Sequence, residues 1–228
     1  MRNTNAILCI TLSVLASLSV QANTEQSFDV NRFNRVAASQ GVEVNITMGS
    51  STQVVVKAET EKDLERLEIE VDDGELRIRR GAWSSSIWNW RGSGGRVSVG
   101  VVVSELEGLS ASLGAKVIAV EVDCEELSLD ASSGSTIVVT GGCNAVEVDA
   151  SSGAVVDARD FKVEVVTVDA SSGAYIDVFA SVNFQGDASS GASVDVFGTP
   201  KLFEASTSSG ARIARRGEAS VSSFKVSI

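Results

Sequence analysis

Residues 130–134 read Asp-Ala-Ser-Ser-Gly, and this short stretch decides the fold because its last three residues recur. Ser-Ser-Gly ends again at Gly153, Gly173, Gly191 and Gly210. A degenerate copy, Ser112-Leu113-Gly114, comes first, and successive glycines are 20, 19, 20, 18 and 19 residues apart. A period this regular is typical of stacked units, none of which can bury its own apolar face alone.

Positions counted from each glycine show which side chains face the core. Three residues after the glycine the residues are Val117, Ile137, Val156, Ile176, Val194 and Ile213. Three residues before it they are Ala111, Ala131, Ala150, Ala170, Ala188 and Thr207, and five before it Leu109, Leu129, Val148, Val168, Gly186 and Ala205. Positions of one parity share a face of a strand, so these columns are predicted to point inward. The columns predict an all-β fold, a single-stranded parallel β-helix (β-solenoid) with rungs of about 19 residues and an irregular N-terminal β portion.

The opposite parity gives two outward columns of aspartate. Four residues before the glycine stand Asp130, Asp149, Asp169 and Asp187, and four after it stand Asp157, Asp177 and Asp195. Hydrated carboxylates need no counter-ion, so no cofactor is expected; calcium bridging the column of Asp157, Asp177 and Asp195 is the alternative. Continued alternation would place the glycines on a flat outer stripe. We favour the other arrangement, a corner where glycine takes a positive φ.

The chain divides into three parts. Residues 1–22 have the features of a cleaved signal peptide: Arg2, an apolar stretch over 6–20, and a small-x-small end at Val20-Gln21-Ala22. Residues 23–104 are predicted to hold N-terminal strands and a tryptophan-rich loop, as the start of the same domain. Residues 105–228 are predicted to form the repeat solenoid, with 221–228 as its last strand. The mature chain is expected in the periplasm, secreted or at the cell surface, with no transmembrane segment; a retained N-terminal anchor is the competing interpretation.

Two local signals organise the N-terminal part. Thr60-Glu61-Lys62-Asp63 resembles a capping box and predicts a short helix that ends near Leu67. Asp73-Gly74 predicts a hairpin between strands at 67–71 and 76–78.

All three tryptophans fall within eight residues of one Gly- and Ser-rich loop. Trp83, Trp88 and Trp90, with Arg91, would offer flat apolar faces and one cation, which suit sugar rings, peptides or a protein partner. The other interpretation is that the loop folds back and covers one end of the solenoid. The sequence leaves these two alternatives open.

Cys124 and Cys143 are 19 residues apart, and each lies ten residues before its glycine. They therefore occupy one column in adjacent rungs, at a strand spacing of about 4.8 Å that a disulfide accepts. An exported protein meets an oxidising compartment, so we predict a disulfide between them. Two free buried thiols are the alternative.

Composition narrows the function. The chain has no histidine, which excludes Ser-His-Asp and Cys-His nucleophiles and most zinc sites. Its formal net charge of -11 disfavours nucleic acid as a partner. An enzyme is not expected. Because glycosidases use pairs of carboxylates, the stacked carboxylates leave a polysaccharide-active enzyme as the least favoured alternative.

The order of several short motifs resembles a bacterial family, the putative auto-transporter adhesin, head GIN domain family. The resemblance is carried by Phe28-x-Val30-x-x-Phe33, Gly41-Val42-Glu43-Val44, Asp73-Gly74-x-Leu76-x-Ile78 and the serial Ser-Gly turns. It spans roughly residues 28–228. It implies a right-handed parallel β-helix-like fold, an extracytoplasmic location and, by name, adhesion, and it implies no catalytic residues.

Together these features predict an exported, non-catalytic, adhesin-like binding module of the bacterial cell envelope. The expected partner is an envelope glycan or protein. The alternative is a structural or scaffold solenoid that assembles with envelope partners. An open end strand could also pair with another copy and give homo-oligomers.

Overall fold

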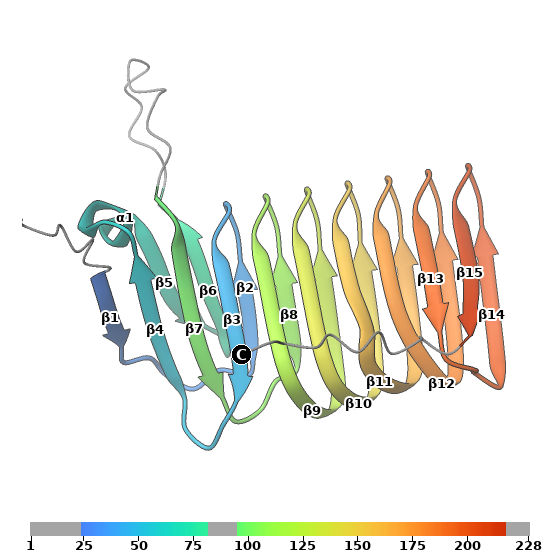
Figure 1. Cartoon of the computed structure of the whole chain (residues 1–228), viewed down its shortest axis with the longest axis horizontal. Helices are drawn as coiled ribbons and strands as arrows, with labels where there is room; N and C mark the ends of the chain where they lie inside the picture. The colour runs from blue at the N-terminus through green and yellow to red at the C-terminus, as the bar shows by residue number, and fades with distance from the viewer. Residues whose placement is uncertain (1–23, 82–94, 218–228) are drawn as a thin grey trace, which may run out of the picture.

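The structure, a computed structural model, describes residues 24–81 and 95–217, and these form a stack of parallel rungs (Figure 1). The N-terminal elements are β1 (Thr24–Phe28), β2 (Arg35–Ala38), β3 (Glu43–Met48), β4 (Gln53–Ala58), α1 (Glu61–Glu65), β5 (Leu67–Asp72), β6 (Glu75–Arg80) and β7 (Val97–Val103). The repeats supply β8 (Gly108–Ala111), β9 (Lys116–Ala131), β10 (Thr136–Ala150), β11 (Val155–Ala170), β12 (Tyr175–Ala188), β13 (Ser193–Phe197), β14 (Leu202–Thr207) and β15 (Arg212–Gly217). The predicted all-β solenoid is confirmed.

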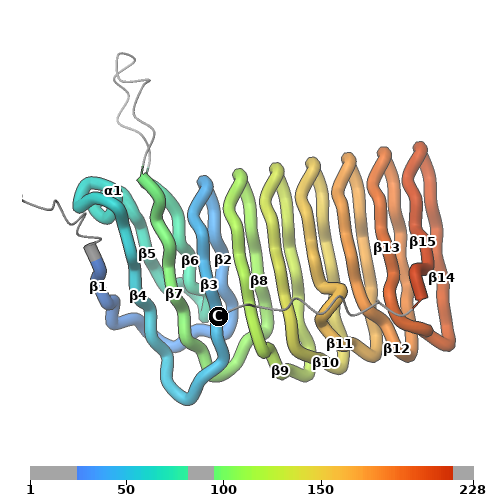
Figure 2. Tube along the Cα trace, in the orientation of Figure 1, coloured from blue at the N-terminus to red at the C-terminus, as the bar shows by residue number. Residues whose placement is uncertain are grey.

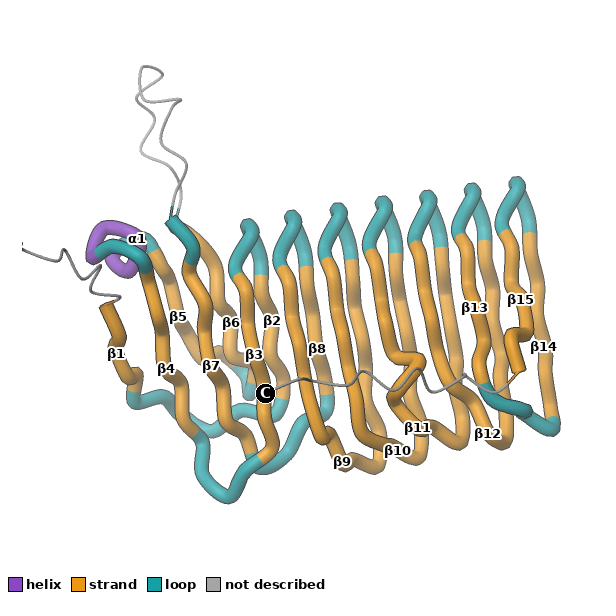
Figure 3. The backbone as a smooth tube through the Cα atoms, in the orientation of Figure 1, coloured by secondary structure: helices purple, strands orange, loops and turns teal. Residues whose placement is uncertain are grey.

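Each Ser-Ser-Gly forms a tight turn between the two strands of a rung. In the turn 132–135, Ser133 has φ 53° and Gly134 φ 69°, and the Ser135 N–H donates to the Ser132 carbonyl at 3.2 Å. Positive φ at both central residues defines a type I′ turn. The Gly134 N–H donates to the carbonyl of Ser152 in the next turn at 3.1 Å, so the ladder continues through the turns. The glycines therefore lie at corners, as we favoured, and the turns line one edge of the molecule (Figure 3).

A turn that the spacing of the glycines does not reveal lies far upstream. Gln40 and Gly41 have φ 57° and 71°, and the Gly41 N–H donates to Leu113 in the neighbouring turn at 3.1 Å. The flanking strands β2 and β3 pair in parallel with β8 and β9, so they form a rung of the same stack. Glutamine replaces the usual serine here, and the next copy comes only after β4–β7. The spacing of the glycines therefore gave no signal.

The strands β4–β7 extend and close the N-terminal end of the stack. β6 and β7 pair in parallel with β2 and β3 and make one more rung. Outside that rung the pairing reverses: β5 is antiparallel to β6, β4 to β7, and β1 to β4. Antiparallel strands thus cover this end, which is the blue and teal end in Figure 2.

The predicted inward columns form the core. Val117, Ile137, Val156, Ile176 and Val194 are at most 1% exposed, as are Leu109, Leu129, Val148 and Val168. The alanine column is also buried in every rung from β8 to β12. Only in the last rung do the same positions emerge, because Ala205 and Thr207 are exposed and Ile213 is half-buried.

One short helix interrupts the N-terminal strands. Asp63 donates its backbone N–H to the Thr60 hydroxyl at 3.2 Å, so Thr60 caps α1 as the sequence predicts. The helix ends at Glu65, before Leu67, because Leu67 already belongs to β5. No helix among the described residues combines the length and apolar character that crossing a membrane requires.

Cys124 and Cys143 are register partners in β9 and β10, with Cα atoms 4.7 Å apart, and they form a disulfide. We expect that replacing Cys124 with Ser leaves one titratable thiol at Cys143 in the unfolded, unreduced mature chain. The bridge closes a short loop, so its loss should cost at most about 3 kcal/mol of the free energy of unfolding.

Thiol titration in denaturant without reductant checks this pairing, with the unreduced wild-type mature chain as the control. Finding no new thiol in the Cys124→Ser variant would contradict it.

Candidate functional site

An unbroken column of acidic side chains runs along the outer face of the strands that precede the turns. Asp130, Asp149, Asp169 and Asp187 are register partners in β9, β10, β11 and β12. Parallel pairing places successive members of such a column about 4.8 Å apart. Ser110 and Ser206 continue the column at its two ends. We call these four aspartates the acidic column.

The acidic column lines a groove of about 850 Å³ that follows the stack. Serines two residues further along each strand form a second row beside it, and the intervening alanines point into the core. The serine row is Ser112, Ser132, Ser151, Ser171, Ser189 and Ser208. We call this feature the acidic groove; it offers carboxylates, hydroxyls and backbone along several rungs.

Within the described part of the chain, none of the four aspartates forms an ion pair with a lysine or arginine. Asp130 accepts hydrogen bonds from the hydroxyls of Ser128 at 3.2 Å and Ser110 at 3.4 Å. Partial loss of hydration raises the pKa of Asp149 above its ordinary value, and the charges of Asp130, Asp169 and Glu147 raise it further. The column is therefore a line of uncompensated negative charge.

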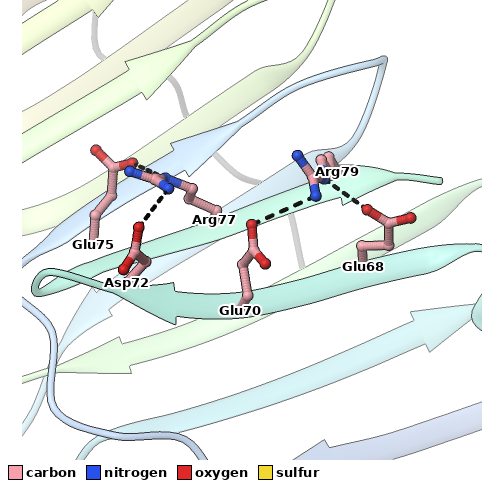
Figure 4. Close-up of polar contacts among 6 residues, drawn as sticks. All are labelled: Glu68, Glu70, Asp72, Glu75, Arg77 and Arg79. Atoms are coloured by element: carbon pink, nitrogen blue, oxygen red, sulfur yellow. Dashed lines mark hydrogen bonds and ion pairs between the residues drawn. The ribbon is translucent and has the colours of Figure 1, made fainter. Parts of the chain in front are cut away.

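Two arginines line the N-terminal end of the acidic groove, but their charges are already compensated. Arg77 binds Glu75 at 2.7 Å and Asp72 at 2.9 Å. Arg79 binds Glu68 at 2.7 Å and Glu70 at 3.5 Å (Figure 4). This local network joins β5 to β6, and it leaves the aspartates further along the groove without cationic partners among the described residues.

The second column, Asp157, Asp177 and Asp195, is neutralised by arginines. Arg159 bridges Asp157 and Asp177, and Arg212 and Arg216 both bind Asp195, at 3.0 and 2.8 Å. Across residues 24–81 and 95–217, no three His, Cys, Asp or Glu side chains gather in a way that could hold a metal ion. The carboxylates we considered for calcium are thus held by guanidinium groups.

The predicted contact residues Trp83, Trp88, Trp90 and Arg91 lie outside the described residues. The structure does describe both flanks of that segment, which joins β6 to β7 at the turn edge of the end rung. The Arg80 guanidinium donates to the Gly95 carbonyl at 2.9 Å, and the Gly95 N–H donates to the buried carboxylate of Asp63 at 3.0 Å. The residues on either side of the segment are therefore tied to each other and, through Gly95, to α1.

The sequence placed the acidic column on the outer face but did not single it out as a site. A usable signal was present, because Asp-Ala-Ser-Ser-Gly occurs in full in four rungs, ending at Gly134, Gly153, Gly173 and Gly191. The arginines at the end of the groove carried no signal. Their position depends on β6 entering the stack beside β2, far from the repeats.

Comparison with known proteins agrees with this architecture. Residues 32–200 match the model of a family described as putative auto-transporter adhesin, head GIN domain. A solved structure described as a putative adhesin from Bacteroides fragilis is 12% identical, covers 86% of this chain and 98% of its own, and has a TM-score of 0.65. One described as a putative lipid binding protein from Parabacteroides distasonis is 13% identical, covers 85% and 96%, and has a TM-score of 0.50. At such identities these two structures show a shared fold; no curated protein matches the chain.

Proposed function

Because the chain belongs to the family described as putative auto-transporter adhesin, head GIN domain, we propose that it is a non-catalytic binding module of the bacterial cell envelope. We place its contact surface in the acidic groove. The ligand we propose is an extended chain that carries positive charges, such as a basic segment of another envelope protein.

One observation carries this proposal: the acidic column lacks cationic partners among the described residues, whereas the column of Asp157, Asp177 and Asp195 has them. Carboxylates spaced by about 4.8 Å suit a ligand that runs along the stack and meets several rungs at once. Opposite charges in a groove attract such a ligand and orient it. The serine hydroxyls beside the column lack a histidine to activate them, since the chain has none, so the groove is better suited to binding than to catalysis.

The test uses a short oligolysine peptide as the probe and the mature chain from residue 23. Replacing all four aspartates of the acidic column with asparagine is expected to weaken binding at low salt by at least about tenfold, because each lost charge removes part of the attraction. Isothermal titration over a range of salt concentrations measures the effect, and the wild-type affinity should fall as salt rises.

A matched control removes four exposed acids away from the groove, in the variant Asp29→Asn, Glu43→Gln, Glu61→Gln, Glu65→Gln. Equal loss of binding in both quadruple variants would show an effect of net charge alone and would refute the groove. A further arm replaces Trp83, Trp88 and Trp90 with alanine. Loss of binding there, with binding intact in the groove variant, would move the contact surface to the tryptophan segment.

The pKa of Asp149 adds a pH dependence with a defined sign. A raised pKa in the folded state means that the folded protein binds this proton more tightly than the unfolded chain. Ionised Asp149 therefore lowers stability at neutral pH, and Asp149→Asn is expected to be folded and at least as stable as wild type. On acidification, binding should begin to weaken at a higher pH than an aspartate of ordinary pKa would give, because the raised pKa of Asp149 makes it lose its charge at a higher pH.

A further inference from the structure

The C-terminal end of the core is uncovered within the described residues. Phe203 and Ile213 of the last rung are half-buried, and Ala205 is exposed. Phe203 and Ile213 have register partners one rung earlier, Phe184 and Val194, and these partners are fully buried. No described strand pairs with the outer edge of β14 or β15, which form the last rung in Figure 1.

The outer edge of this rung also presents unpaired backbone groups. The Arg212 N–H donates inward to Ala192 and the Ser208 N–H to Ala188. In a parallel ladder alternate residues point to opposite neighbours, so the amides of Ala205, Thr207 and Ile213 point to the open edge. An unpaired strand edge beside partly exposed core residues can pair with a further strand.

Arg215 argues against a second copy of the chain as the partner of this end. It is the register partner of the buried Val196, so a charged residue stands where the inward column continues. Its guanidinium lies 4.3 Å from the centre of the Phe203 ring and donates to the Pro200 carbonyl at 2.9 Å. Two copies stacked through this end about a two-fold axis would bring their Arg215 side chains together, which like-charge repulsion disfavours.

We propose that residues 218–228 of the same chain cover this end as an antiparallel strand on β15. These eleven residues follow β15 directly and span up to about 35 Å when extended, more than the roughly 20 Å of a six-residue strand such as β15. Phe224, Val226 and Ile228 alternate with Lys225 and Ser227, so one face of such a strand is apolar. The tether keeps the segment at a millimolar effective concentration, and the other end of the stack is closed by antiparallel strands as well.

Hydrogen exchange on the mature chain tests the proposal by comparing the full chain with one that stops at Gly217. We expect the deletion to raise the exchange rate of the Ile213 amide, which a strand on β15 would bond, by about tenfold or more, and to leave β9 and β10 unchanged. In the full chain, replacing Phe224, Val226 and Ile228 with serine should reproduce the deletion. The matched variant Lys225→Thr, Ser227→Thr, on the other face of the strand, should not.

Two results would overturn the proposal. The first is that the deletion leaves exchange at the open edge unchanged. The second is that protection of this edge in the full chain rises with protein concentration together with a dimer in light scattering, which would make a second copy the occupant.

Discussion

Replacing Gly141 with alanine will destabilise the protein far more than the same replacement at Gly134, although both glycines have a positive φ. At Gly134, φ is 69° and an added Cβ meets nothing within 4 Å. The cost there is the left-handed conformation itself, about 1–2 kcal/mol. At Gly141, φ is 122° and an added Cβ would lie 2.6 Å from the backbone nitrogen of Val122, with its other nearest atoms also in the Val122 backbone.

A backbone neighbour cannot rotate away as a side chain can, so relief at Gly141 requires β9 to shift against β10. Gly141 lies at a bulge where the β9–β10 register changes, two residues before the disulfide at Cys143. We therefore expect Gly141→Ala to lower the free energy of unfolding by at least about 3 kcal/mol. Urea unfolding followed by circular dichroism measures both variants against wild type. A difference of less than about 1 kcal/mol between them would show that the bulge adapts freely, contrary to this prediction.

The same bulge explains how a repeat of variable length forms regular columns. The sequence predicted the columns because every offset was counted from the glycine, and the type I′ turn holds that end of each rung constant. Rungs of 18 to 20 residues differ at the opposite corner, where the pairing of β10 with β9 and β11 and of β11 with β12 shifts register. Counting from the glycine could not locate these shifts, because the corner residues, such as Gly141 and Phe161, share no pattern between rungs.

The candidate site was only partly predictable for a related reason. Alternation placed both aspartate columns on outer faces, and the structure agrees. Which column keeps its charge depends on arginines in other rungs: Arg159 reaches Asp177 in the next rung, and Arg212 and Arg216 reach back to Asp195. Those contacts follow from side-chain direction across strands, which the spacing within one repeat does not specify.

One inward column of aliphatic side chains is interrupted by a glycine, and a larger side chain in the neighbouring column fills the space. Five residues before the glycine the series runs Leu129, Val148, Val168 and then Gly186. In the neighbouring column Val166 is followed by Phe184, which is fully buried and stacks on Phe203 with ring centroids 4.9 Å apart. A Cβ at Gly186 would lie 2.6 Å from Cζ of Phe184. The missing side chain of Gly186 is therefore the space that the Phe184 ring fills.

This complementarity predicts that two destabilising replacements will rescue each other. Phe184→Val alone leaves a void beside Gly186 and should cost about 2–3 kcal/mol. Gly186→Val alone forces a branched side chain into the ring and should cost about 1–3 kcal/mol or more. Together they recreate Val166 and Val168, the pair that packs without exposure in the rung before. We expect the double variant to recover at least about 2 kcal/mol relative to the sum of the single losses.

A double-mutant cycle in urea measures the coupling, with Val148→Ala and Phe184→Val as the control pair, because Val148 pairs with Val168 in β11 and lies two rungs from Phe184. Distant pairs should be additive, while Phe184 and Gly186 should not be. Additive losses for Phe184 and Gly186 would contradict this prediction. They would mean that the two residues are energetically independent and that the stack relaxes around either change. A positive coupling would show that a rung accepts either Phe with Gly or Val with Val at these two positions. In a stack of nearly equal rungs, stability depends on the total side-chain volume of each layer more than on which residue provides that volume.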